Sequence, residues 1–199
     1  MPRLPSPSKD DMAALEPLSR LGLNDIVVIS TRQQAEHAFQ ALDAHNVLGF
    51  DTESKPTFVR DEVSEGPHVV QFSTLHKAYV FQLHDAGCRE MVATLLVSER
   101  ITKVGFGLAG DHVQIMRTLG VQPKNVLDLN AVFSKKGHIK EIGVRGAVAV
   151  VFKRRFLKSR KATTSNWANR QLTESQIIYS ANDAWAAIKV FHGLGLLPA

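Results

Sequence analysis

The chain has 199 residues, of which 44% are hydrophobic and 22% charged, as expected for one globular domain with a sizeable core. Its single cysteine, Cys88, excludes an internal disulfide and a zinc site built from several cysteines. The net charge is +5. No apolar run approaches the ~18 residues that a membrane helix needs, so no membrane partner is expected.

The first 25 residues contain four prolines, which predicts an N-terminal arm with one short helix around Asp10–Leu15. We assign residues 1–25 to this arm and residues 26–199 to a single domain. The first residues lack the apolar core of a signal peptide, so we expect a cytoplasmic protein.

Hydrophobic patterning predicts mainly strands in the first half of the domain. The expected elements are a strand over 25–30, a helix from Thr31 to about Ala44, a strand over 47–53, and a hairpin with strands over 68–74 and 78–83. A polar loop over 54–67 separates the second strand from the hairpin. Loops of this length are commonly functional or mobile.

Helices and strands alternate in the second half. The expected elements are helix 86–97, strand 101–106, helix 110–119, a short strand at 125–129 followed by a small helix, a helix over 139–152, a basic loop, and a helix from Thr173 to about His192. Thr173 and Gln176 have the spacing of a capping box. A hairpin followed by strand–helix units predicts an α/β fold with a mixed sheet flanked by helices on both faces.

Positive charge gathers in residues 135–161, which hold ten Lys/Arg and one acid and so carry +9. The rest of the chain holds 14 basic and 18 acidic residues, giving −4. A polyanion is the natural partner of such a segment, with a solvated basic face as the alternative. The side chains expected to meet phosphates are Lys153, Arg154, Arg155, Lys158, Arg160 and Lys161. Phe58, in the loop over 54–67, is a candidate for stacking on a terminal base, or for packing.

Two carboxylates, Asp51 and Glu53, come directly after the apolar run Val47–Phe50. Because residues i and i+2 of a strand point to the same face, both side chains converge on one spot. Like charges there repel and raise each other's pKa unless a cation lies between them. A strand that simply emerges into solvent explains this pair at least as well. Asp51 and Glu53 alone therefore do not distinguish a cation site from a solvated strand end.

Two further acids shift that balance. Asp111 opens the helix after strand 101–106, near the positive end of the helix dipole. Tyr179 and Asp183 are i, i+4 on the last predicted helix and share a face. Four carboxylates without a Cys or His pair at ligand spacing describe an oxygen-only site, which suits Mg²⁺ or Mn²⁺ rather than zinc. Because two such ions stabilise the attacking and leaving oxygens of a phosphoryl displacement, the pattern predicts a site that cuts nucleic acid.

The segments FDTE, KVGFGLAGD and YSAND resemble the three motifs of the DEDD superfamily of 3′-5′ exonucleases, in the variant whose third motif is Tyr-x-x-x-Asp. The stretch from Thr163 to Ala187 is most similar to the Werner helicase-like exonucleases and more distantly to the ribonuclease D-like group. The sister variant has histidine five residues before the last Asp, where this chain has Ile178. The resemblance implies a ribonuclease H-like fold, two divalent cations and stepwise release of nucleoside 5′-monophosphates from a 3′ end.

Carried over by motif, the resemblance implies that Asp51 bridges both cations. Glu53 and Asp183 would complete the site of the cation that binds the attacking water. Asp111 would hold the second cation directly or through water, and Tyr179 would orient the nucleophile. The expected partner is DNA, or RNA as the alternative, with a free 3′ end, and the sequence leaves protein partners open.

Two other classes of function remain as alternatives. GFGLAG (Gly105–Gly110) matches the dinucleotide-binding pattern, and Asp128 follows near the position of a ribose-binding acid. Against an oxidoreductase, Asp111 would repel a pyrophosphate at that helix start. The second alternative keeps the fold without catalysis, as a nucleic-acid-binding protein.

Overall fold

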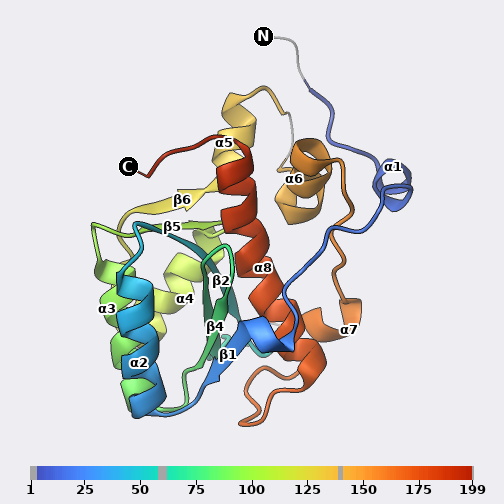
Figure 1. Ribbon diagram of the computed structural model, residues 1–199. Helices are drawn as coiled ribbons and strands as arrows, with labels where there is room; N and C mark the ends of the chain where they lie inside the picture. The colour runs from blue at the N-terminus through green and yellow to red at the C-terminus, as the bar shows by residue number, and fades with distance from the viewer. Residues whose placement is uncertain (1–3, 58–61, 139–140, 199) are drawn as a thin grey trace.

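The computed structural model describes residues 4–57, 62–138 and 141–198. A single sheet of six strands, in the order β1-β4-β3-β2-β5-β6, forms the centre of this part of the molecule (Figure 1). The strands are β1 (Ile26–Ile29), β2 (Val47–Glu53), β3 (Val69–Ser73), β4 (Ala78–Gln82), β5 (Thr102–Gly105) and β6 (Val126–Asp128). β3 runs antiparallel to β2 and β4, whereas the other pairs are parallel. The predicted mixed sheet and its hairpin are confirmed.

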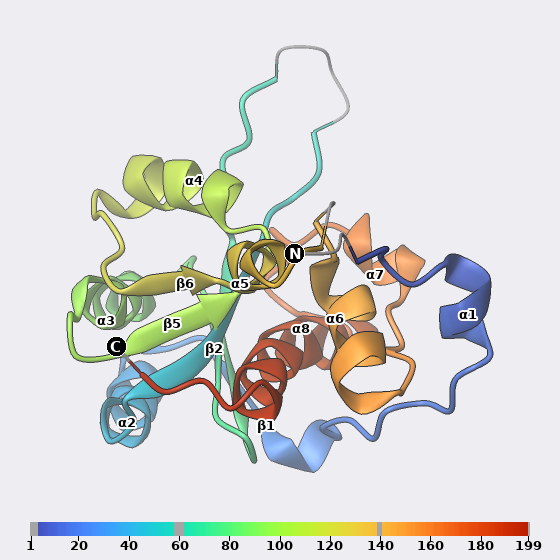
Figure 2. The same ribbon diagram turned by 90° about the horizontal axis from the view of Figure 1, so that it is seen from above.

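Helices cover both faces of this sheet. They are α1 (Lys9–Ala13), the 3-10 helix η1 (Leu23–Asp25), α2 (Arg32–Asp43), α3 (Ala86–Val97), α4 (Ala109–Leu119), α5 (Leu129–Lys135), α6 (Gly143–Phe152), α7 (Arg160–Thr163) and α8 (Glu174–Gly193). Figure 2 shows α2, α3 and α4 on one side of the sheet and α8, α6 and α1 on the other. Each side buries its own apolar cluster. None of the described helices is long and apolar enough to cross a bilayer.

Two element predictions need correction. The helix expected over 139–152 begins at Gly143, and residues 139–140 lie outside the described residues. The region after it, expected to be a loop, contains the short helix α7, which Ser159 caps by accepting a hydrogen bond from the Ala162 amide. The capping box at α8 is confirmed, since Thr173 accepts from the Gln176 amide and the Gln176 side chain reaches back to Thr173.

Gly49 lets helix α8 lie directly on strand β2. A Cβ atom at Gly49 would overlap the backbone carbonyl of Ala184, and Ile188 is also close. Because Asp183 precedes Ala184 and Asp51 follows two residues after Gly49, this close approach brings the two acids together. A glycine in the centre of a buried strand is therefore a requirement of the site.

Replacing Gly49 with alanine is expected to destabilise the protein by about 3 kcal/mol or more, because one methyl group must push α8 off the sheet. Urea unfolding followed by circular dichroism measures this change. Gly110→Ala is the matched control, because a Cβ atom there meets nothing within 4 Å. A Gly49→Ala protein as stable as Gly110→Ala would contradict the role given to Gly49.

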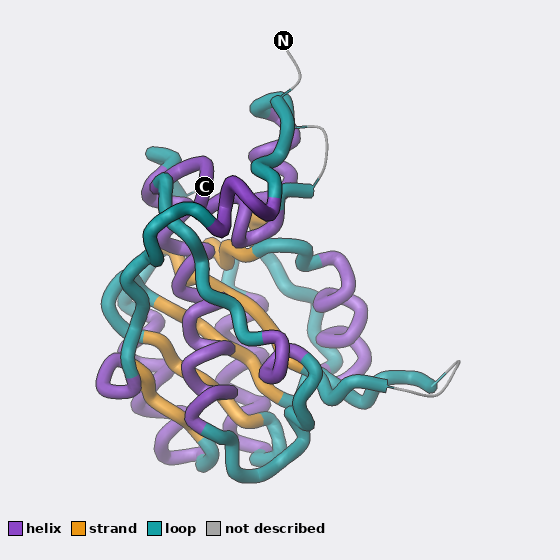
Figure 3. Tube along the Cα trace, turned by 90° about the vertical axis from the view of Figure 1, so that its right-hand side faces the viewer, coloured by secondary structure: helices purple, strands orange, loops and turns teal. Residues whose placement is uncertain are grey.

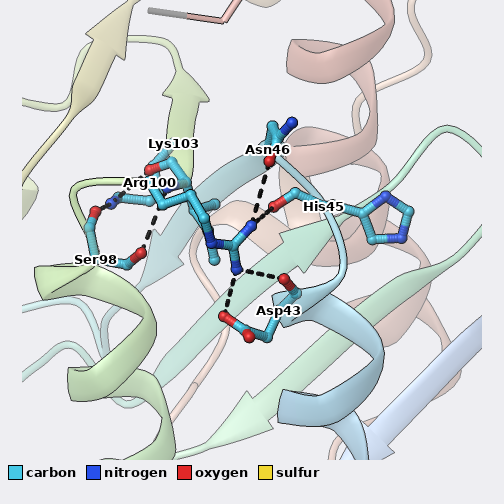
Figure 4. Close-up of polar contacts among 7 residues, drawn as sticks. Asp43, His45, Asn46, Ser98, Arg100 and Lys103 are labelled. Atoms are coloured by element: carbon cyan, nitrogen blue, oxygen red, sulfur yellow. Dashed lines mark hydrogen bonds and ion pairs between the residues drawn. The ribbon is translucent and has the colours of Figure 1, made fainter.

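Polar side chains join α2 to β5 at the end of the sheet where β2 begins (Figure 4). The Arg100 guanidinium donates to Asp43 Oδ1 at 2.6 Å and to Asn46 Oδ1 at 3.2 Å. Lys103 is fully buried, and its ammonium donates to the carbonyls of Ser98 and Ile101 at 2.6 and 2.8 Å. Burial lowers the pKa of Lys103 to about 8. The Arg100 contacts thus tie the residues before β5 to the end of α2 and to Asn46, which precedes β2.

Helix α4 holds both described ends of the loop between β2 and β3, which extends away from the sheet (Figure 3). Near its start, the Ser54 hydroxyl donates to Gln114 Oε1 at 2.6 Å. Near its end, the Thr118 hydroxyl donates to the Gly66 carbonyl at 2.7 Å, and Arg117 donates to the Ser64 carbonyl. The loop thus begins beside the carboxylates of β2, and hydrogen bonds from α4 fix the position of both of its described ends.

Candidate functional site

Three carboxylates meet where the end of β2 faces the middle of α8. Asp51 and Glu53 end β2 on one face, and Asp183 comes from α8, which packs across that face. One oxygen from each of the three lies within 4.8 Å of the others. Asp183 is buried, and Asp51 and Glu53 are half-buried. The structure therefore brings together three of the four acids expected at the site.

The fourth acid, Asp111, lies beside this group but outside it. It sits in the first turn of α4, and its carboxylate accepts a hydrogen bond from the Thr52 hydroxyl. Burial raises the pKa of Asp111, and the bond from Thr52 opposes that rise. Because Thr52 lies between Asp51 and Glu53 in β2, this bond fixes α4 against the strand that carries the other acids.

Lys158 is the cation of the carboxylate group. Its ammonium nitrogen is 2.7 Å from Asp183 Oδ2 and 5.0 Å from the centre of the Tyr179 ring. The side chain of Lys158 is 26% exposed and that of Asp183 only 4%. Lys158 was expected to meet a phosphate of the substrate, and the structure places its ammonium beside Asp183. Lys158 of the segment 153–161 therefore belongs to the site, whereas Lys161 of the same segment is exposed.

Electrostatics in the group favour another positive charge. Burial, and then repulsion from Asp51 and Asp183, raise the pKa of Glu53 to about 10. Burial followed by the same kind of repulsion also raises the pKa of Asp51 well above its ordinary value. Burial alone would lower the pKa of Lys158, but attraction to Asp183 outweighs it and the pKa rises. One ammonium thus neutralises one of three carboxylates, which leaves a formal charge of −2 when all three ionise.

Tyr179 lies one helical turn before Asp183 and faces the same side of α8. Its hydroxyl accepts a hydrogen bond from the Thr163 hydroxyl at 3.1 Å, and its ring packs against Trp167 with 5.9 Å between centroids. Tyr179 is only 7% exposed, and burial followed by the nearby Asp183 charge raises its pKa. The phenol is therefore protonated and held in place near the carboxylates.

The remaining predicted phosphate contacts fall into different places. Lys153, Arg154 and Lys161 are exposed. Arg155 is half-buried, and its guanidinium donates to the Ala13 carbonyl at 2.8 Å, so it holds the N-terminal arm instead of facing open solvent. Arg160 begins α7. Phe58 lies outside the described residues.

Several residues at the site carry no sequence signal that we used. Thr52, Gln114 and Thr163 are polar residues of ordinary type, and only the fold places them against Asp111, Ser54 and Tyr179. Lys158 was named as a phosphate contact, but nothing in the sequence singled it out among the ten basic residues of its segment as the partner of Asp183. Thr52 is the one of these residues that could have been noticed in the sequence, because it is a polar residue between two acids of a strand.

The Gly-rich turn has a structural role. Asp128 accepts from the Leu108 amide at 3.1 Å and from the Asn130 amide at 2.9 Å, so it ties the turn before α4 to the start of α5. Both carboxylates of the dinucleotide pattern, Asp111 and Asp128, are thus engaged within the protein. The sheet also contains the antiparallel strand β3 next to β2. These contacts remove the basis of the oxidoreductase alternative.

Comparisons with known proteins agree on one family. A family model described as a 3′-5′ exonuclease matches residues 26–197. The chain is 28% identical over 165 residues to the bifunctional 3′-5′ exonuclease/ATP-dependent helicase WRN of Mus musculus, covering 82% of this chain and 12% of that protein. It is 27% identical over 153 residues to a 3′-5′ exonuclease of Arabidopsis thaliana, covering 76% of this chain and 53% of that protein. The chain thus spans about half or less of these curated relatives.

A solved structure extends this agreement to the fold. The RNase D of Trypanosoma brucei, in complex with RNA U12, matches with a TM-score of 0.75 at 20% identity, over 85% of this chain and 62% of that chain. The ribonuclease H-like fold expected from the motifs is confirmed by this likeness and by the mixed sheet.

Proposed function

The chain belongs to the 3′-5′ exonuclease family of the DEDD superfamily, and from this membership we propose that it removes nucleoside 5′-monophosphates from the 3′ end of nucleic acid by metal-dependent hydrolysis. The observation that carries the proposal is the group of Asp51, Glu53 and Asp183, with their oxygens within 4.8 Å of one another. Such a group has no structural benefit of its own, because buried like charges destabilise the fold unless a cation joins them.

The donor set fits a hard divalent cation. All three groups are carboxylates, the ligand type of Mg²⁺ and Mn²⁺. Once all three ionise, the charge of −2 that remains beside Lys158 matches one such ion. We propose that Asp51, Glu53 and Asp183 hold one cation and that Asp51 and Asp111 hold a second, directly or through water. Cations at these positions would lower the pKa of a bound water and neutralise phosphate charge.

The chain's own residues would supply orientation. In our proposal the Tyr179 hydroxyl, kept protonated and fixed by Thr163, accepts or donates one hydrogen bond to the attacking water and sets its direction. Lys158 would contact a phosphate oxygen, because its ammonium already lies at the edge of the carboxylate group. Burial of Asp183 and Tyr179 keeps bulk water from this side of the reacting phosphate.

For the substrate we propose DNA first, because the stretch from Thr163 to Ala187 resembles the Werner helicase-like exonucleases more than the ribonuclease D-like group. RNA trimming is the second candidate, and it is favoured by the likeness in fold to an RNase D bound to RNA.

A gel of 5′-labelled DNA and RNA of one sequence, incubated with Mg²⁺, Mn²⁺ or EDTA, tests the proposal. We expect a ladder that shortens from the 3′ end only when metal is present, with the faster sugar identifying the preferred substrate. Intact substrate in every lane would overturn the proposed activity, and binding of the same oligonucleotides would then favour a non-catalytic role.

Replacing Tyr179 with phenylalanine is expected to slow hydrolysis by about 100-fold, because the attacking water loses its fixed direction while the carboxylates remain. Single-turnover kinetics on a short oligonucleotide measure the rate. The rise in melting temperature on adding Mn²⁺ should stay at the wild-type value, because the hydroxyl is not a metal ligand in this proposal. Loss of the Mn²⁺ response in Tyr179→Phe would show that its role had been misassigned.

A further inference from the structure

A second cavity, which Lys158 also lines, lies between the N-terminal arm and α6. Its volume is about 530 Å³, within the range of roughly 300–1,000 Å³ that small-molecule sites occupy. We call it the arm cavity, and its lining includes the basic residues Lys9, Arg145, Arg155 and Lys158 and the apolar residues Met12 and Phe156. No carboxylate is among its described lining residues.

The arm cavity is built by specific contacts. Arg155 donates to the Ala13 carbonyl at 2.8 Å, and its backbone amide donates to the Glu16 carbonyl at 2.8 Å. Arg145 donates to the Lys158 carbonyl at 3.1 Å. The Arg155 Nε is buried and has no hydrogen-bond partner among the described residues. Figures 1 and 2 both show α1 of the arm beside α6. The arm is thus fixed as one wall of a basic cavity.

Lys158 connects this cavity to the carboxylates. It also lines the cavity of about 260 Å³ that contains Asp51 and Asp183, and its ammonium pairs with Asp183. Gly143 and Val144 line the carboxylate cavity, whereas the next residue, Arg145, lines the arm cavity. The two cavities are therefore neighbours along the first turn of α6. If the last phosphodiester bond of a nucleic-acid chain lies at the carboxylates, the nucleotide before that bond can reach the positively charged arm cavity.

We propose that the arm cavity binds the nucleotide immediately upstream of the one that is removed, and this inference rests on the proposed exonuclease function. The phosphate of that nucleotide would meet Lys9, Arg145 and Arg155, whose positive charges have no carboxylate partner among the residues that line the cavity. Its base would lie against Met12 and Phe156, since a base offers an apolar face to any aromatic or thioether side chain. The N-terminal arm is then part of the substrate site.

The test compares two substrates in a variant of the arm cavity. Lys9→Met with Arg145→Met removes two charges from exposed side chains, so folding should be preserved. The control variant, Lys77→Met with Lys124→Met, removes two charges at the opposite end of the sheet, near the turn after β3 and the start of β6. One substrate is a single-stranded decanucleotide, and the other is the p-nitrophenyl ester of thymidine 5′-monophosphate, which has no upstream nucleotide.

In EDTA, the arm-cavity variant should bind the labelled decanucleotide about tenfold more weakly than the control variant does. The slope of log affinity against log salt should fall by ~0.7 for each phosphate contact that is lost. With metal, kcat/KM on the decanucleotide should fall by a similar factor, whereas kcat/KM on the p-nitrophenyl ester should equal that of the control.

Other results would overturn the inference. If the arm-cavity and control variants bind and cut the decanucleotide alike, the cavity does not take part. Equal losses on both substrates would indicate a general disturbance and would also reject an upstream subsite. If the wild-type protein cuts neither substrate, the proposed function fails, and the binding measurement in EDTA still decides whether the arm cavity holds nucleic acid.

Discussion

Replacing Asp51 with asparagine is expected to reduce 3′-end hydrolysis by about 1,000-fold, which corresponds to about 4 kcal/mol of lost transition-state stabilisation. The substitution keeps the shape of the side chain, and asparagine Oδ1 can still accept the Thr52 amide that Asp51 Oδ1 accepts at 3.0 Å. The loss would therefore come from the missing charge. Single-turnover rates on a 5′-labelled oligonucleotide with saturating Mg²⁺ measure it.

A stability measurement separates this effect from unfolding. In metal-free buffer Asp51→Asn should be at least as stable as the wild type, because one of three mutually repelling carboxylates is gone. Glu141→Gln is the matched control, since Glu141 lines the same cavity as Asp51 but lies outside the group of three. An Asp51→Asn protein that keeps more than a tenth of the wild-type rate would remove Asp51 from the catalytic site.

Local sequence rules predicted the parts of the site that depend on one element. Asp51 and Glu53 share a face because a strand alternates, and Tyr179 and Asp183 share a face because a helix repeats every 3.6 residues. The start of α8 followed from its capping box, which depends on two residues three positions apart. The motif order then predicted that these two elements belong together, which alternation alone could not show.

Contacts between elements could not be predicted in this way. In the sequence, Gly49 is only a glycine within a predicted strand. Its neighbours in the sequence do not indicate that α8 packs on it or that Ala184 is the contact. Lys158 and Arg155 have the same charge and lie three residues apart, yet one enters the carboxylate group and the other holds the arm. Both residues are basic and lie in the same segment, so only the packed chain separates their roles.

The difference between Asp111 and the other acids has the same origin. The helix start placed Asp111 near the end of β2, as expected, but its carboxylate accepts from the Thr52 hydroxyl and lies outside the group of three. The residue that would contact Asp111 could not be foreseen from its place in the sequence. The proposed second cation would have to compete with Thr52 for Asp111, whereas the first would meet carboxylates that already converge.

Adding Mn²⁺ at 100 times its dissociation constant is expected to raise the free energy of unfolding by ~2.7 kcal/mol, because the cation binds only the folded arrangement of Asp51, Glu53 and Asp183. For a chain of this length that corresponds to a rise in melting temperature of roughly 5–11 °C. Differential scanning fluorimetry with increasing Mn²⁺, against EDTA, measures the rise. A melting temperature that does not change when Mn²⁺ is added would contradict the metal site independently of any activity assay.

The same titration on Lys158→Met tests the charge balance within the group. Without metal this variant should be less stable than the wild type, because Asp183 loses the ammonium 2.7 Å away and keeps two carboxylate neighbours. With its positive competitor removed, Mn²⁺ should bind about tenfold more tightly, equivalent to ~1.4 kcal/mol. Lys161→Met, which removes an exposed lysine of the same segment, should change neither value. Weaker Mn²⁺ binding in Lys158→Met would mean that Lys158 helps to assemble the carboxylates and does not oppose the cation.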